Sequence, residues 1–226
     1  MKLLMIDTAS IVATAAILDE HKLMGEIIIN HKKKHSEKLL PAVDQLLNNI
    51  ELEISDIDCF GVVVGPGSFT GLRIGLATVK GFAQALNKPI VTVNTLESLS
   101  ANLEGVEGYR CPILDAQRNE VYTALYDHND EVVMEPRAMP INELIEKLNQ
   151  FKNESIWLLG DGIPKYGEII KEQTPNVHIP DAHLRMNRGS SAAMVGWRKM
   201  IKNDLETYLD AKPLYLRKSY AEENKK

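Results

Sequence analysis

Short hydrophobic runs separated by polar turns occupy the beginning of the chain. The runs at residues 3–6, 11–18 and 23–29 have the length of strands, and each intervening turn opens on an aspartate. Because short turns join neighbouring antiparallel strands, the pattern predicts a three-stranded meander. Apolar residues then recur every three or four positions over residues 36–50, which predicts an amphipathic helix.

The centre of the chain has the pattern of a strand, a glycine-rich loop and a helix. An apolar run at residues 60–64 precedes the loop, and small and apolar residues at helical spacing follow over residues 72–86. Glycine in the middle of a helix costs about 1 kcal/mol relative to alanine, so we expect a favourable interaction to offset this cost. The interaction we expect is a second helix that packs unusually close. The alternative is that the glycines only admit a helix of the same chain. Small residues repeat at four-residue spacing in two stripes: Gly71 with Gly75, and Ala77 with Gly81 and Ala85.

The second half of the chain begins as the first does, with a hydrophobic strand that ends in an aspartate. This parallel predicts a duplicated α/β architecture with lobes at residues 1–104 and 105–226, in which the last helix and tail can pack back on the first lobe. The further elements expected are strands at 90–93, 111–114, 120–126, 132–137 and 156–159, and helices at 95–103, 141–151, 165–172 and 190–202.

Composition narrows the functional classes. The chain has 226 residues, of which 44% are hydrophobic, and a net charge of −5, so no global field attracts nucleic acid. No run is long enough to span a membrane, and Asp7 comes too early for a signal peptide, so we expect a cytoplasmic protein. Cys59 and Cys111 are predicted to be buried, reduced thiols.

The basic connector at residues 31–35 contains two histidines with the spacing of two ligands on one helix face. Three lysines lie between His31 and His35, and no carboxylate nearby completes a metal triad. We therefore expect a solvated turn here and no metal site.

The glycine loop fails three specific templates. Gly71 is followed by Leu72 and Arg73, whereas a phosphate-binding Walker loop requires lysine and a hydroxyl residue. The glycine spacing differs from the dinucleotide fingerprint, and Ser68 lacks the flanking glycines of a nucleophile elbow. The remaining alternatives are anion binding at the N-terminus of the helix, helped by Arg73, and a structural loop.

Two polar turns leave similar alternatives open. The turn after the first strand can hold a metal–phosphate group or can be an ordinary Asx turn. Asp115, Arg118 and Glu120 can form either a catalytic polar network or an ion-paired structural turn. The candidate anion-binding or nucleotide-binding residues are Asp7, Thr8, Ser10, Gly67 and Ser68.

Several motifs together resemble the TsaB family, also called YeaZ. The most specific is GPGSFTGLRIG at residues 65–75, and the resemblance extends over essentially the whole chain in the right order. Gln117 departs from the arginine that is usual in the family at this position. The supporting motifs are IDTAS at 6–10, HSEKLLP at 35–41, LDAQRNEVY at 114–122 and PLYLR at 213–217.

The resemblance implies two RNase H-like lobes of the actin, sugar-kinase and Hsp70 (ASKHA) type. It implies a non-catalytic, cofactor-free role in the bacterial complex that transfers threonylcarbamoyl to adenosine 37 of ANN-decoding tRNAs. The expected partners are the catalytic subunit TsaD and the ATPase TsaE, with homodimerisation when TsaD is absent and only indirect or weak tRNA contact. The competing hypotheses are a metallopeptidase-like enzyme and an ATP-dependent sugar-kinase-like enzyme.

The resemblance also implies that the helices at 36–50 and 72–86 form the dimerisation face, as a four-helix bundle with the partner. The paralogous TsaD carries a metal-binding Asn-His-Leu-Glu-Gly-His motif, whereas this chain has Thr95 and Leu99 at the two histidine positions. Neither side chain is a suitable ligand for a transition metal, which favours a scaffold. The candidate partner-binding residues are Leu39, Leu40, Val43, Leu47, Gly71, Leu72, Arg73, Gly75, Val79 and Phe82.

Overall fold

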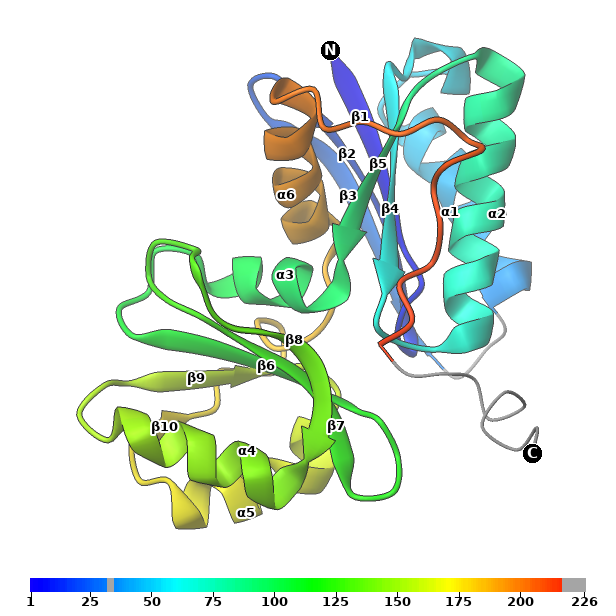
Figure 1. Ribbon diagram of the computed structural model, residues 1–226. Coiled ribbons are helices and arrows are strands. Elements are labelled where there is room, and N and C mark those ends of the chain that lie inside the picture. The colour runs from blue at the N-terminus through cyan, green and yellow to red at the C-terminus, as the bar shows by residue number, and fades with distance from the viewer. Residues whose placement is uncertain (32–34, 217–226) are drawn as a thin grey trace. The chain divides into compact units, whose positions relative to one another are not determined.

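The computed structural model describes residues 1–31 and 35–216, which form two units (Figure 1). The first unit contains Met1–Asn102 and Met186–Pro213, and the second contains Leu103–Arg185 and residues 214–216. The first boundary falls beside the predicted one at residue 104, and the segment Met186–Pro213, which contains the last helix, belongs to the first unit. No helix among the described residues is both long and apolar enough to cross a membrane.

The first unit is built on a five-stranded mixed sheet with the order β3-β2-β1-β4-β5. The first three strands form the predicted antiparallel meander, and β4 and β5 pair in parallel with their neighbours. Strand β1 lies at the centre of the sheet and is hydrophobic because both of its faces are covered. The strands are β1 (Lys2–Asp7), β2 (Val12–Asp19), β3 (Leu23–Asn30), β4 (Cys59–Gly65) and β5 (Ile90–Asn94).

Helices cover both faces of this sheet. Helices α1 and α2 lie side by side on one face, and α6 packs on the other (Figure 1). On the α6 side, Ala192 and Ala193 pack in one cluster with Leu3 and Met5 of β1. The helices of the unit are α1 (His35–Asn49), α2 (Phe69–Leu86), α3 (Thr95–Ser100) and α6 (Gly189–Ile201). A 3-10 turn η1 (Ile54–Asp56) precedes β4, and a second, η2 (Ala101–Leu103), lies at the boundary between the two units.

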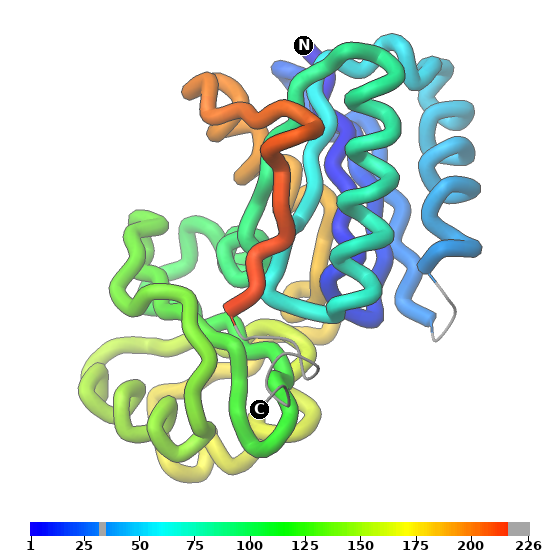
Figure 2. Tube along the Cα trace, turned by 45° about the vertical axis from the view of Figure 1, so that its right-hand side comes forward, coloured from blue at the N-terminus to red at the C-terminus, as the bar shows by residue number. Residues whose placement is uncertain are grey.

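Polar contacts attach the C-terminal segment to the first unit. The Glu26 carboxylate on β3 accepts hydrogen bonds from the Ser190 N–H and hydroxyl, both at 3.0 Å, and pairs with Arg188 at 3.1 Å. A carboxylate at a helix N-terminus satisfies exposed backbone N–H groups and complements the helix dipole. After α6 the chain pairs with β5 through Ile90 and Glu206 and continues beside α2 (Figure 2).

The second unit repeats the architecture of the first. Its sheet has the order β10-β9-β6-β7-β8, with an antiparallel meander of three strands and two further parallel strands. Helices α4 and α5 share a core cluster with this sheet. The elements are β6 (Tyr109–Asp115), β7 (Glu120–Tyr126), β8 (Val132–Pro140), α4 (Ile141–Leu148), η3 (Asn149–Phe151), β9 (Ile156–Leu159), α5 (Ile163–Gln173) and β10 (Val177–His178).

Candidate functional site

The glycine loop is locked against the turn that follows β1. Ser68 caps α2 by accepting a hydrogen bond from the Gly71 N–H at 3.2 Å, and its own N–H donates to the Ala9 carbonyl at 2.7 Å. A Cβ on Gly67 would overlap the Ala9 carbonyl oxygen, and a Cβ on Gly71 would overlap that of Thr8. Glycine is therefore required here by a close approach of two backbones of the same chain.

The candidate nucleotide-binding residues are engaged in contacts within the chain. The fully buried Asp7 carboxylate accepts hydrogen bonds from the Ala9 N–H and from Asn187 Nδ2, both at 2.8 Å. The Thr8 hydroxyl donates to the Gly71 carbonyl at 2.8 Å, and the Ser10 hydroxyl accepts from the Val12 N–H at 3.1 Å. These contacts, with those of Gly67 and Ser68, favour the structural interpretation of both turns.

Burial also changes the acidity of Asp7. Desolvation raises the pKa of this carboxyl group, and the hydrogen bonds from Ala9 and Asn187 and the charge of His35 oppose the rise. His35 Nε2 donates to the Ser10 carbonyl at 2.8 Å, so this ring is already used within the chain. The other predicted histidine, His31, is exposed, and residues 32–34 of the basic connector lie outside the described residues.

Most of the predicted partner-binding side chains lie in the core of the first unit, where they are covered by residues of the same chain. A Cβ on Gly75 would overlap the Thr8 hydroxyl, and Gly71 contacts the same turn. The stripe of α2 that contains Gly71 and Gly75 faces the sheet, on the opposite side of the helix from the solvent. The buried side chains among the predicted set are Leu39, Val43, Leu47, Leu72 and Val79.

The other three predicted partner-binding residues are accessible to different degrees. Leu40 on α1 is 52% exposed, a large value for a leucine. Arg73 is exposed, with its guanidinium 3.8 Å from the centroid of the Phe69 ring. Phe82 is half-buried and contacts Phe60, with 5.5 Å between the ring centroids.

The second small stripe of α2 lies on the solvent side of the helix. Ala77, Gly81 and Ala85 are exposed, and a Cβ on Gly81 would meet no atom within 4 Å. α2 contains no acidic residue and only two basic ones, Arg73 and Lys80. This exposed stripe therefore carries small side chains and no acidic residue, and the exposed Arg73 lies one turn before Ala77. The four-residue repeat was visible in the sequence, but periodicity did not distinguish it from the buried stripe.

The residues at the TsaD-like metal positions do not fit a metal ion. Thr95 and Leu99 lie on α3 and are fully buried. The helix is capped by Asn94, whose side chain accepts from the Leu96 N–H at 2.8 Å, and Glu97 pairs with Lys199 at 3.3 Å. Within residues 1–31 and 35–216, no three His, Cys, Asp or Glu side chains are grouped to hold a metal.

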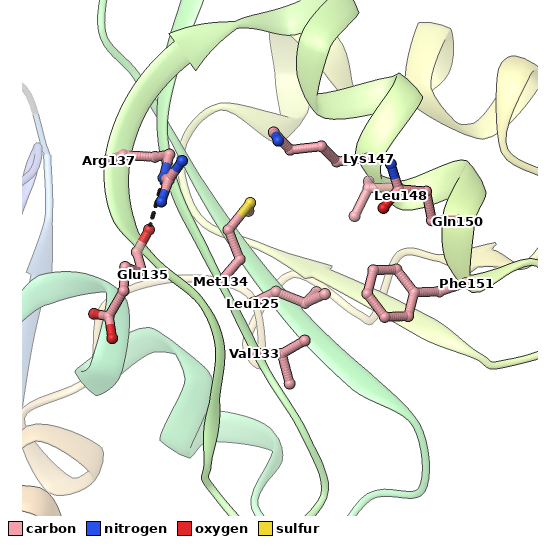
Figure 3. Close-up of a pocket in the computed structure, with 9 residues that line it drawn as sticks. All are labelled: Leu125, Val133, Met134, Glu135, Arg137, Lys147, Leu148, Gln150 and Phe151. Atoms are coloured by element: carbon pink, nitrogen blue, oxygen red, sulfur yellow. Dashed lines mark hydrogen bonds between the residues drawn. The ribbon is translucent and has the colours of Figure 1, made fainter.

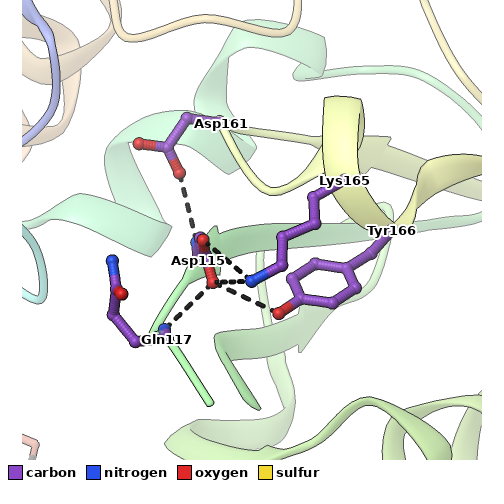
Figure 4. Close-up of polar contacts among 5 residues, drawn as sticks. All are labelled: Asp115, Gln117, Asp161, Lys165 and Tyr166. Carbon is purple, nitrogen blue, oxygen red and sulfur yellow. Dashed lines mark hydrogen bonds and ion pairs between the residues drawn. The ribbon is translucent and has the colours of Figure 1, made fainter. Parts of the chain in front are cut away.

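In the second unit, Asp115 is the centre of a polar network (Figure 4). Its carboxylate pairs with Lys165 Nζ at 3.1 Å and accepts hydrogen bonds from the Tyr166 hydroxyl at 3.2 Å and the Gln117 N–H at 2.9 Å. Its own N–H donates to Asp161 Oδ1 at 3.3 Å. This arrangement joins the end of β6 to α5, which favours the structural interpretation of the turn.

The charges of this network shift two pKa values. Partial desolvation and the Asp115 charge raise the pKa of Asp161, against the hydrogen bond from the Asp115 N–H. The hydroxyl of Tyr166 and then the Asp115 carboxylate raise the pKa of Lys165. An ammonium with a raised pKa stays protonated at neutral pH, so Lys165 serves here as a cation and is a poor general base.

A family model and the sequences of known proteins both relate this chain to proteins of tRNA threonylcarbamoyladenosine biosynthesis. The family model described as "TsaD: tRNA N6-adenosine threonylcarbamoyltransferase" matches residues 22–225. The tRNA threonylcarbamoyladenosine biosynthesis protein TsaB of Bacillus subtilis is 35% identical over 175 residues, which cover 76% of each chain.

Solved structures agree at the level of the fold. YeaZ from Pseudomonas aeruginosa superposes with a TM-score of 0.76 at 22% identity, over 95% of this chain and 99% of that chain. The ROK hexokinase of Thermus thermophilus has a TM-score of 0.53 at 11% identity, over 89% of this chain and 100% of that chain. The two-unit fold is thus of the ASKHA type.

Proposed function

The chain belongs to the TsaB family of tRNA threonylcarbamoyladenosine biosynthesis proteins, and from this premise we propose that it acts as a non-catalytic accessory subunit. In the proposed role it holds TsaD in its active arrangement and helps to recruit TsaE. The complex then transfers threonylcarbamoyl to adenosine 37 of ANN-decoding tRNAs in the cytoplasm. Because the net charge is −5, tRNA contact would be indirect or weak.

The observation that carries this proposal is the exposed face of α2. Helix axes pack 8–10 Å apart depending on the side chains between them, so small side chains permit the closest approach. Ala77, Gly81 and Ala85 provide such a surface, and the neighbouring helix α1 carries an exposed apolar side chain, Leu40. We propose that α1 and α2 pack against the equivalent helix pair of TsaD, or of a second copy of this chain when TsaD is absent.

Two further observations support a role without catalysis. The side chains at the TsaD-like metal positions, Thr95 and Leu99, are buried and are not metal ligands of the kind that a transition metal requires. Asp7, Thr8 and Ser10 form hydrogen bonds within the chain. The reacting groups would therefore come from TsaD.

Reconstitution tests the proposal. The purified chain is combined with TsaD, TsaE, threonylcarbamoyl-AMP, ATP and unmodified tRNA, and the modified adenosine is quantified by mass spectrometry of tRNA digests. We expect modification to fall at least tenfold when the chain is omitted and to return when it is added back. Undiminished modification without the chain would refute the accessory role.

The two enzyme alternatives make different predictions. A metallopeptidase-like enzyme would contain a stoichiometric transition metal after purification, which elemental analysis detects. A sugar-kinase-like enzyme would bind ATP in the isolated chain, which calorimetry detects. We expect neither, because the polar groups of the turn after β1 already have partners within the chain.

A further inference from the structure

A pocket of about 280 Å³ opens in the second unit, between the edge strand β8 and the segment α4–η3 (Figure 3). It is separate from the α1 and α2 surface of the first unit. Its lining combines apolar and cationic side chains: Leu125, Val133, Met134, Glu135, Arg137, Lys147, Leu148, Gln150 and Phe151.

The floor of the pocket is apolar. Leu125 and Leu148 belong to the core cluster of the second unit, and Met134 and Phe151 pack against that cluster. Val133 at the mouth is 43% exposed. Covering an apolar surface that is open to water lowers the free energy, which favours the binding of a ligand.

A bulge in β8 brings the Arg137 side chain to the face of the sheet that carries this floor. Thr123 pairs with Arg137 but Leu125 pairs with Met134, so β8 has one extra residue between the two pairs. Residues three apart in a regular strand point to opposite faces, and the bulge instead places Arg137 and Met134 on the same face. Bulges of this kind re-aim side chains next to binding sites.

The two cationic side chains of the lining lie toward one end of the pocket, whereas Gln150 lies near Phe151 at the other end (Figure 3). In Figure 3, the Lys147 ammonium reaches toward the Arg137 side, Phe151 lies at the far end, and the Glu135 carboxylate points away. Arg137 Nε donates to the Glu135 carbonyl at 3.3 Å, and within the described residues no carboxylate lies within ion-pair distance of this guanidinium. Among the described residues, the only ion pair of Lys147 is a solvent-exposed one with Glu143 at 3.7 Å, a type of contact that is weak.

We propose that this pocket binds a small molecule with an apolar body and a terminal carboxylate. Arginine and lysine at one end match the anion, and the apolar floor matches the body. The volume of about 280 Å³ lies near the lower end of the range for small-molecule sites, about 300–1,000 Å³, which suits a small ligand of about ten heavy atoms. The lining combines an apolar floor with a few polar groups, which is the usual composition of a small-molecule site.

Calorimetry of the full chain with octanoate tests the proposal, with octanol and octylamine as matched probes. We expect saturable binding of one octanoate per chain with a dissociation constant of about 1 mM or lower, the range set by a ligand of this size. We expect at least tenfold weaker binding for octanol and none for octylamine. Equal binding of octanol and octanoate, or no octanoate binding, would overturn the proposal.

Two variants locate the site, and a third is the control. The double variant R137Q/K147Q removes the cationic end, and we expect it to bind octanoate at least tenfold more weakly. V133W fills the mouth from an exposed position and should abolish binding without affecting the core. K152Q removes an exposed lysine that does not line the pocket and should bind as the original chain does. Octanoate binding unchanged in V133W, with folding verified by circular dichroism, would place the ligand elsewhere.

Discussion

Replacing Gly81 by leucine tests the exposed face of α2 most directly. The built Cβ at this position meets no atom within 4 Å, so the side chain enters solvent in the isolated chain. Leucine has a helix propensity about 0.8–1 kcal/mol better than glycine, so we expect the free chain to become more stable. For a protein of this size, a gain of about 1 kcal/mol raises the unfolding temperature by roughly 2–4 °C.

The same substitution should weaken association with TsaD. If this face is the proposed docking surface, a leucine side chain on it would force the two helices apart, and such overpacking costs about 1–3 kcal/mol. This corresponds to an increase of about 5-fold to 150-fold in the dissociation constant. The predicted combination of a more stable chain and a weaker complex is specific to an interface position.

Gly75→Ala is the matched control on the buried stripe. Its new methyl group would overlap the Thr8 hydroxyl, which donates to the Gly71 carbonyl at 2.8 Å. Val62 and Ile6 lie 3.6 and 3.7 Å from the built Cβ, which leaves the methyl group little space to move away. Overpacking of about 1–3 kcal/mol and loss of a hydrogen bond of about 1 kcal/mol exceed the propensity gain of about 1 kcal/mol. We expect a net destabilisation of about 1–3 kcal/mol.

Urea unfolding followed by far-UV circular dichroism measures both stability changes, and surface plasmon resonance with immobilised TsaD measures affinity. Sedimentation velocity reports self-association of the free chain in parallel. A Gly81→Leu protein that binds TsaD as tightly as the original chain would refute the assignment of this face. A Gly75→Ala protein more stable than the original would refute the account of the buried stripe.

Three further outcomes follow from the buried groups. Burial raises the folded-state pKa of Asp7 above its unfolded value of about 3.9, so the stability that the protonated group contributes is lost as pH rises through the folded pKa. Urea unfolding should therefore show Asp7→Asn gaining stability relative to the original chain as pH rises above about 4, and a constant difference would contradict this. Burial raises the pKa of Cys59 and of Cys111 to about 12, so iodoacetamide at pH 7.5 should modify neither thiol until urea unfolds the chain, as mass spectrometry would show. Arg110 is fully buried and pairs with Asp130 in the turn before β8 at 2.7 Å. Arg110→Met should therefore lower the free energy of unfolding by about 1–3 kcal/mol and speed amide exchange in this turn. Unchanged exchange would contradict the inference that Arg110 holds the turn.

The sequence predicted most of the elements because their signals are local. Alternating and helical periodicities depend only on neighbouring positions, and they gave the meander of the first unit and α1, α2 and α6 within a few residues. Elements that depend on distant partners were missed or misjudged. The two-residue strand β10 exists only through its pairing with β9, and the helix expected at residues 95–103 ends at Ser100 and continues as the turn η2.

The sequence by itself also determined the family, since the motif at residues 65–75 is specific without knowledge of the fold. It identified two stripes on α2, both made of small residues at four-residue spacing, so it could not tell which one was already covered by the same chain. Only the tertiary structure decided this, because the Thr8 turn comes from a part of the chain distant in sequence and fills the space beside Gly75, while the space beside Gly81 stays open. The same long-range contacts returned the segment Met186–Pro213 to the first unit, where Glu26 and Asp7 hold it through polar groups that no local pattern connects.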